Sequence, residues 1–181
     1  DRENKAVLDA LLKNGAKVNT KDINGETILM YAAEGANSDN IDALLENGAK
    51  VNAKDINGKT TLMYAADGAN RDNIDALLEN GAKVNAKDDE GLTALMYAAE
   101  KENKAVLDAL LKNGAKVNVN AKDINGKTPL MYAAEGANRD NIDALLENGA
   151  KVNAKDYEGL TALMYAAEKE NKAVLDALLK N

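Results

Sequence analysis

The chain has 181 residues, with 23 Lys and Arg against 30 Asp and Glu, so its formal net charge is −7 at pH 7. It contains no Cys and no His, which removes thiol nucleophiles, thiolate metal ligands and the commonest general base. The acidic balance argues against nucleic acid, whose phosphates attract basic surfaces. No apolar run approaches the ~18 residues of a membrane span and no targeting segment is apparent. We therefore expect no membrane partner and a cytoplasmic location.

The chain is a tandem array of similar units. The string Leu-Met-Tyr-Ala-Ala occurs five times, and its Met residues are spaced by 33, 33, 35 and 33 positions. Such a period is typical of solenoids, in which stacked units bury one continuous core. With each unit starting at a recurring Asp, one continuous domain divides into residues 1–21 (second half of a preceding unit), 22–54, 55–87, 88–122, 123–155 and 156–181 (no trailing hairpin).

A second, longer period relates pairs of units. Residues 54–86 and 122–154 differ only at Thr61/Pro129 and Asp67/Glu135, and residues 87–113 and 155–181 differ only at Asp89/Tyr157. The offset in both cases is 68 residues. A recent duplication and a composed sequence both explain this near-identity.

Within a unit, the first helix is predicted from Pro129 to Glu135. Thr128 supplies a capping hydroxyl, and Pro is favoured at the first helical position because it needs no N–H bond there. A second helix is expected to start near Asn138, with apolar residues at helical spacing up to Leu146.

Asn148-Gly149 ends this second helix, since glycine adopts the left-handed stop conformation. Residues 151–161 then read as an extended hairpin, with Asp156 and Gly159 as turn residues at its tip. Two short helices and a hairpin bury too little surface alone, so an all-α stacked solenoid is predicted.

The unit resembles the ankyrin repeat. The resemblance rests on Asp123-Ile124-Asn125-Gly126-Lys127-Thr128-Pro129-Leu130, Ala133-Ala134, Leu145-Leu146 and Asn148-Gly149-Ala150-Lys151-Val152-Asn153, and it recurs along the whole chain. It implies a helix-turn-helix with a β-hairpin finger in each ~33-residue unit. It also implies protein binding without catalysis, metal or cofactor. The family's usual histidine after the leucine is Met here, and we expect Met not to replace its hydrogen bonds.

The family's contact positions map onto hairpin tips and the exposed side of the first helices. At and beside the tips they are Ile23, Asn24, Glu26, Ile56, Asn57, Lys59, Asp89, Glu90, Leu92, Ile124, Asn125, Lys127, Tyr157, Glu158 and Leu160. On the first helices they are Glu34, Asp67, Glu100, Lys101, Glu135, Glu168 and Lys169.

Five of the six tyrosines occupy one position of the unit: Tyr31, Tyr64, Tyr97, Tyr132 and Tyr165. One interpretation is an aromatic ladder that lines a concave groove and anchors partners. The other is packing between stacked helices, with only the hydroxyl in water. Both stay open from the sequence alone.

Three classes of function follow. The first is a protein-interaction module or scaffold. The second is an engineered or consensus ankyrin scaffold without an evolved partner, favoured by the scarce variation between units. The third is a targeting fragment of a larger enzyme or effector.

Two irregularities give further expectations. The unit 88–122 is two residues longer because Val119-Asn120 repeats Val117-Asn118. We expect a local bulge or a displaced tip at Ile124 and Asn125, with continued helix stacking. The alternative is a disordered loop with no effect on the groove. In either case we expect an interrupted concave face between Tyr97 and Tyr132. The chain also begins and ends on the same kind of second helix, which leaves apolar residues such as Val7 and Leu11 without a covering helix. End-to-end self-association is expected from these uncapped termini.

Overall fold

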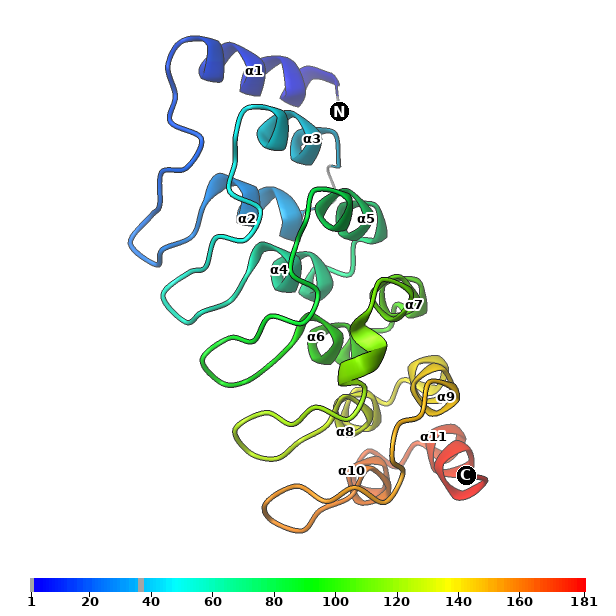
Figure 1. Cartoon of the computed structure of the whole chain (residues 1–181). Coiled ribbons are helices and arrows are strands. Elements are labelled where there is room, and N and C mark those ends of the chain that lie inside the picture. Colours follow the sequence, from blue (N-terminus) through cyan, green and yellow to red (C-terminus); the bar gives the residue numbers. More distant parts are fainter. Residues whose placement is uncertain (1, 36–37) are drawn as a thin grey trace.

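The computed structural model describes residues 2–35 and 38–181. Over these residues the chain forms short helices joined by turns and hairpin loops (Figure 1). Their bounds are α1 Arg2–Lys13, α2 Ile28–Glu34, α3 Ser38–Glu46, α4 Thr61–Asp67, α5 Arg71–Glu79, α6 Ala94–Glu100, α7 Lys104–Lys112, η1 Ala115–Asn118 (a 3₁₀ helix), α8 Pro129–Glu135, α9 Arg139–Glu147, α10 Ala162–Glu168 and α11 Lys172–Leu179.

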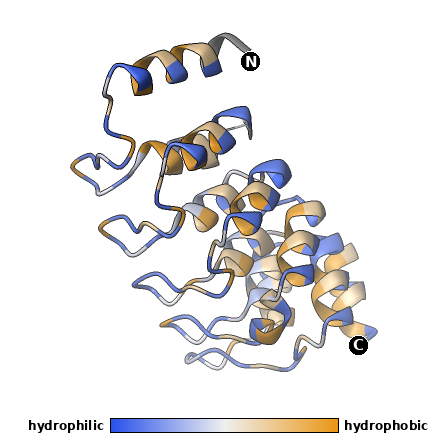
Figure 2. Ribbon diagram, turned by 45° about the horizontal axis from the view of Figure 1, so that its top comes forward, coloured by the Kyte–Doolittle hydropathy of each residue, from blue (hydrophilic) through white to orange (hydrophobic). Residues whose placement is uncertain are grey.

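The helices stack in two parallel rows. One row holds the first helices of the units, in the order α2, α4, α6, α8, α10, and the other holds the second helices α1, α3, α5, α7, α9, α11. Each helix packs on the next of its row, and each first helix packs on its own second helix (Figure 1). Orange apolar stripes face each other between the rows, while the loops are mostly polar (Figure 2). The predicted all-α solenoid is confirmed.

Each first helix follows a threonine in extended conformation, and Thr27, Thr60 and Thr93 cap their helices through Oγ1. Thr60 Oγ1 accepts the backbone N–H of Met63, as expected. The expectation that methionine makes no hydrogen bond here is wrong in three units, because the Sδ atoms of Met30, Met63 and Met131 accept the backbone N–H of the capping threonine at 3.3–3.4 Å. A thioether is a weak acceptor, but its flexible chain can fold back over the first turn.

Two buried asparagines connect the second helices to the preceding unit. Asn73 in α5 donates through Nδ2 to the carbonyl oxygens of Ala33 and Gly35 at 2.9 and 2.8 Å. Asn141 in α9 makes the same contact with Ala99 and Lys101, at 3.1 and 2.7 Å. These carbonyls lie at the ends of α2 and α6, where helical backbone has no partner of its own. The amides therefore fix the register between neighbouring units.

The hairpin fingers are held by turns and contain almost no strand pairing. In the described residues, the only ladder contacts assigned are isolated antiparallel bridges, Lys21 with Thr27 and Lys54 with Thr60. The tips are also joined to one another, because Asn24, Asn57, Glu90 and Asn125 each accept a backbone N–H from the next tip at 2.9–3.0 Å. The expected finger is present, but it is stabilised by stacking on the neighbouring finger.

The two extra residues are absorbed in η1. Ala115–Asn118 coil into a 3₁₀ helix, with Val117 exposed at 80% and Val119 buried at 5%. Asn120 then donates through Nδ2 to Gly149 O and accepts the Lys151 N–H through Oδ1. Asn52, two units earlier, makes the same bonds with Gly81 O and Lys83 N–H. The bulge is thus local, and Val119-Asn120 occupy the regular positions.

The stack continues across this longer unit. Helix α6 packs directly on α8, and the tip of the next unit stays in line through Ile124 N–H to Glu90 O at 2.9 Å. Continued stacking is confirmed, whereas a displaced tip is not observed. The insertion forms a turn of its own, and its local effect falls on Asn85, whose buried Oδ1 lacks the lysine N–H that Asn19, Asn52 and Asn120 accept.

The outer helices expose part of their apolar faces. Val7 and Leu11 in α1 are 59% and 56% exposed, although the equivalent Val106 and Leu110 in α7 are fully buried. Leu8 is buried against the core. At the other end, Leu179 is 67% exposed.

Candidate functional site

The five repeated tyrosines are tied to the hairpins by a repeated hydrogen bond. Each hydroxyl donates to Oδ2 of the Asp that starts its own unit, at 2.7–2.9 Å. The same Asp accepts two backbone N–H groups of its turn through Oδ1, as Asp55 does from Asn57 and Lys59. One carboxylate therefore holds both the tip and the tyrosine, so the finger is fixed against the first helix.

Burial separates the five tyrosines. Tyr64 is only 7% exposed, Tyr31 is 56% exposed, and the others are half-buried. The packing interpretation therefore fits the inner units better. The packing interpretation is wrong about the hydroxyl groups, because each one donates to an aspartate carboxylate and is not hydrated only by water.

These contacts shift the ionisation of both partners. Burial raises the pKa of Tyr64, Tyr97 and Tyr132, and the hydrogen bonds to carboxylates raise it further. Burial also raises the pKa of Asp156, but the bonds from the Tyr165 hydroxyl and the Leu160 N–H outweigh it, so this pKa lies below its ordinary value.

Two lysines lie between successive tyrosine rings. Lys59 Nζ is 4.4 Å from the ring centre of Tyr64 and 4.5 Å from that of Tyr97. Lys127 Nζ lies at 5.2 and 4.5 Å from the rings of Tyr132 and Tyr165. A cation at this distance is attracted by the face of an aromatic ring.

Carboxylates of the first helices pair with the same lysines. Lys59 Nζ is 2.8 Å from Asp67, which also contacts Lys101 at 2.8 Å, and Lys127 Nζ is 2.7 Å from Glu135. Burial raises the pKa of Asp67, but the bonds from Lys101 and Lys59 outweigh it and hold this pKa below its ordinary value. These ammonium groups are already partnered within the chain.

The lysine position differs from unit to unit. It is Glu26 in the first full unit, where the carboxylate lies 2.7 Å from the Tyr64 hydroxyl and shares its proton with Asp55. It is Leu92 and Leu160 in two others. Since the tips and helices stay in line from Tyr97 to Tyr132, the expected geometric interruption is not observed. What changes there is the chemistry, from a cation to an apolar side chain.

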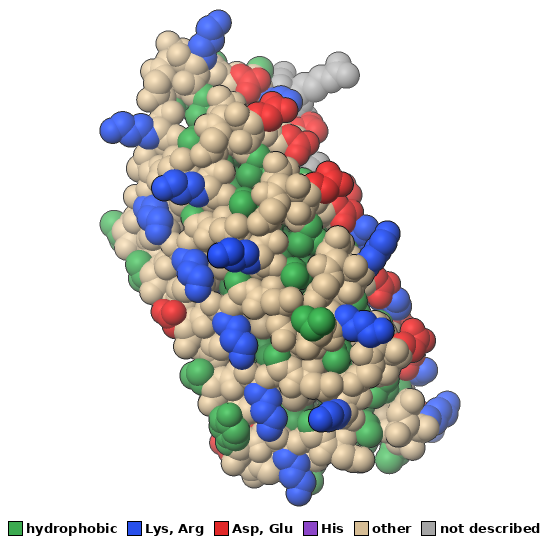
Figure 3. Space-filling model, in the orientation of Figure 1, with side chains coloured by type: hydrophobic (Ala, Val, Ile, Leu, Met, Phe, Trp, Pro, Cys, Tyr) green, Lys and Arg blue, Asp and Glu red, His purple; other side chains and the backbone are tan. Residues whose placement is uncertain are grey.

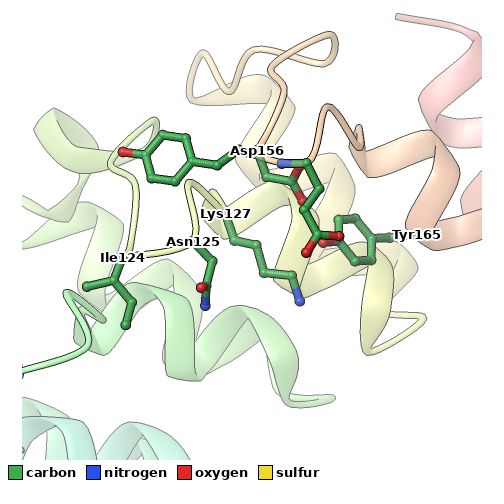
Figure 4. Close-up of a pocket in the computed structure, with 7 residues that line it drawn as sticks. Ile124, Asn125, Lys127, Asp156 and Tyr165 are labelled. Atoms are coloured by element: carbon green, nitrogen blue, oxygen red, sulfur yellow. The ribbon is translucent and has the colours of Figure 1, made fainter.

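Two hollows with equivalent lining positions open beside these lysines. One, of about 340 Å³, is lined by Asn57, Lys59, Asp88, Asp89, Glu90 and Tyr97. The other, of about 420 Å³, is lined by Ile124, Asn125, Lys127, Asp156, Tyr157, Glu158 and Tyr165. Figure 4 shows Lys127 reaching from its hairpin toward Tyr165. Six lining positions correspond at the 68-residue offset, and only Asp89/Tyr157 differs in residue type.

The predicted contact residues are mostly accessible. The apolar tip residues Ile23, Ile56, Ile124 and Tyr157 are 95%, 64%, 59% and 72% exposed. The acidic residues with exposed side chains are Glu34, Asp89, Glu90, Glu100, Glu158 and Glu168, and Lys169 is also exposed. Asp67, Lys101 and Glu135 are half-buried in the pairs described above or beside them. The hollows bring together some of these positions, and Glu34, Glu100 and Glu168 lie outside them.

The sequence prediction missed the recurring aspartates as members of this surface. Asp88 and Asp156 line the hollows, although they read as turn residues only. The signal was available, since Asp and Tyr occur nine positions apart in all five units.

No cluster of three or more acidic side chains in residues 2–35 and 38–181 is arranged to hold a metal ion. None of the helices described is both long enough and apolar enough to cross a bilayer.

The two rows of helices and the stacked fingers define a helical-repeat solenoid with one repeated polar and aromatic surface. The family model of ankyrin repeats (3 copies) matches residues 1–88, 56–121, 70–156 and 95–181, so the chain belongs to the ankyrin repeat family. Members of this family are generally protein–protein interaction modules and are typically non-catalytic. No curated protein matches the chain.

Proposed function

We propose that this chain is a non-catalytic interaction module that binds protein partners through the hairpin tips and the concave face of its first helices. The tyrosine surface supports this most directly. We define it as the five repeated tyrosines with the tip residues and helix acids named above. Apolar tip residues, aromatic rings and charged groups lie together on it, a mixture that favours partner anchoring.

The charge of this surface suggests a basic partner. Its inner lysines are paired with Asp67 and Glu135. The charge left for a partner therefore comes mainly from exposed acids at the tips, such as Asp89, Glu90 and Glu158. Opposite charge speeds encounter and selects between partners more than it adds affinity.

A display library of short peptides, selected for binding to the whole chain, tests this proposal. We expect enrichment of peptides with Lys or Arg beside an aromatic or aliphatic residue. The double variant Asp89→Lys with Glu90→Lys should lose most of this binding. The control Glu46→Lys with Glu79→Lys changes the charge equally on the second helices and should keep it. Equal loss in both variants would remove the tyrosine surface as the binding site.

A scaffold without an evolved partner is the second candidate. It is supported by the near-identity of residues 54–86 and 122–154, since a surface fitted to one partner usually varies between units. In this case the selection yields no sequence preference, and the Asp89→Lys variant binds the same peptides as the parent chain.

Self-association through the outer helices belongs to the same proposal. Val7 and Leu11 at one end and Leu179 at the other present apolar side chains that equivalent inner helices bury. Sedimentation velocity should then show a sedimentation coefficient that rises with concentration, and the Val7→Glu with Leu11→Glu variant should abolish the rise. A constant coefficient in the parent chain contradicts this part.

A further inference from the structure

Basic and acidic residues are unevenly distributed along the units, which the net charge of −7 does not show. The connectors are the segments between each second helix and the next hairpin, residues 14–21, 47–54, 80–87, 113–122 and 148–155. They carry ten of the 23 basic residues and none of the 30 acidic residues. The rest of the chain is correspondingly more acidic than −7 indicates. The connectors therefore form a strongly basic strip on an acidic protein.

The strip consists of two rows of lysines at the unit repeat. The outer row is Lys17, Lys50, Lys83, Lys116 and Lys151, all of which are exposed. Lys116 belongs to the extra turn η1, so the regular part of the row runs from Lys17 to Lys83. The second row is Lys21, Lys54, Lys87, Lys122 and Lys155. Figure 3 shows basic side chains running along the length of the molecule on this side, with acidic side chains gathered at the edge of the second helices.

Hydrogen bonds hold the connectors side by side. Lys21, Lys54, Lys87 and Lys122 each donate through Nζ to the carbonyl oxygen of the next lysine of their row, at 2.6–2.9 Å. Asn19, Asn52 and Asn120 each accept the N–H of an outer-row lysine one unit further on, at 2.7–2.9 Å. The backbone of the connectors is thus ordered before any partner arrives, except at Lys116, where Asn85 Oδ1 makes no such bond. This order lowers the entropy cost of binding.

We propose that the connectors form a second interaction surface, which binds an extended acidic polypeptide segment along the outer lysine row. Stacked helices lie about 8–10 Å apart, which sets the spacing of the lysines. An extended chain advances about 3.3 Å per residue, so along the regular part of the row, from Lys17 to Lys83, every third residue meets the next lysine. The matching ligand carries Asp or Glu at every third position.

The composition of the strip favours a peptide over nucleic acid or a membrane. The connectors contain no aromatic residue and no Arg, so they offer bases no stacking platform. Acidic side chains of the second helices, such as Asp42, Glu46 and Glu79, border the strip and are exposed. A wide polyanion or a flat anionic bilayer meets these acids as well as the lysines, whereas a single extended chain meets the lysines alone.

Fluorescence anisotropy with two synthetic peptides tests the proposal. Both have 15 residues of Glu, Gly and Ser in equal numbers. One places Glu at every third position and the other places all five together. At low salt we expect the first to bind about tenfold more tightly, the ratio given by about two additional exposed ion pairs. Added salt should weaken both.

Two charge-matched variants locate the binding. The first replaces the five lysines of the outer row by Gln and should lose the preference for the regularly spaced peptide. The second replaces five exposed lysines in or directly after the second helices, Lys5, Lys13, Lys112, Lys172 and Lys180, and should keep it. Circular dichroism of both variants verifies that they are folded.

Three results overturn the proposal. They are equal affinity of the parent chain for the two peptides, equal loss in the two variants, and no binding of either peptide at low salt. A thymidine 15-mer that binds the parent chain more tightly than the regularly spaced peptide assigns the strip to nucleic acid instead.

Discussion

At the scale of single residues, the carboxylate at the start of each unit does more than shape a turn. It accepts two N–H groups of the turn and the hydroxyl of a tyrosine on the first helix, as Asp88 does from Glu90, Leu92 and Tyr97. A charged acceptor makes such bonds stronger than those between neutral groups. The finger and the helix are therefore coupled through one side chain.

This coupling predicts alkaline sensitivity. The pKa of Tyr64, Tyr97 and Tyr132 is raised in the fold, so the neutral phenol is favoured there. The stability that these groups contribute is fully present below about pH 10, the ordinary pKa of tyrosine, and is lost as the pH rises through the raised values. Phenolate absorbance of the folded chain should lag behind that of the chain in urea and then rise as the fold opens. Coincident titration curves would contradict this prediction.

At the scale of helices, glycine permits the closest approach between units. A Cβ on Gly68, at the end of α4, would overlap the carbonyl oxygen of Glu34 at the end of α2. Gly35 has a similar negative φ but only ordinary contacts around its missing Cβ.

Gly68→Ala is expected to lower the free energy of unfolding by about 1–3 kcal/mol, because backbone must move to make room. Gly35→Ala should change it by less than about 1 kcal/mol, since no strain opposes the added methyl group. Urea denaturation of both variants measures the difference. Equal losses would mean that intrinsic helix-end preference, and not close approach, sets the effect.

The two extra residues also give a prediction for an element. Removing Val117-Asn118 or Val119-Asn120 produces the same sequence, in which the connector has the length and sequence of the regular connectors, where no 3₁₀ helix forms. Because the stack and the Asn120 bonds are those of a regular unit, the deletion should leave the free energy of unfolding within about 0.6 kcal/mol of the parent value. A large loss of stability would show that η1 contributes to the packing of α7.

Much of this element structure could be predicted from sequence. Thr128-Pro129, the Asn138 start and the Asn-Gly stops predicted the helix ends because these signals act locally. The Asn73 and Asn141 bonds, the tyrosine–lysine stacks and the tip ladder could not be derived in the same way, since they join residues of neighbouring units. The position of the bulge was ambiguous for a simpler reason, because the dipeptide is duplicated and only packing distinguishes Val117 from Val119.

At the scale of the whole molecule, stability should fall toward the ends. Leu77 and Leu178 occupy equivalent positions and are both buried, at 0% and 3% exposed. Leu77→Ala should cost about 2–5 kcal/mol, because neighbours on both sides pack around the cavity. Leu178→Ala should cost less, because α11 has a neighbour on one side only and opens locally. Urea denaturation with hydrogen exchange of α11 measures both effects, and equal costs would contradict an array whose ends open first.

The distance between the two matched hollows sets the separation that two anchors on one partner would need. They lie two units apart in an unbroken stack, so helix spacing places them about 16–20 Å from each other. An extended segment covers that distance in about five or six residues. A partner with two anchors at this separation gains from the first contact a high effective concentration for the second, and one with a different separation does not. If the proposed binding occurs at these hollows, the 68-residue duplication makes avidity depend on anchor spacing, and Asp89 and Tyr157 give the two hollows different side chains.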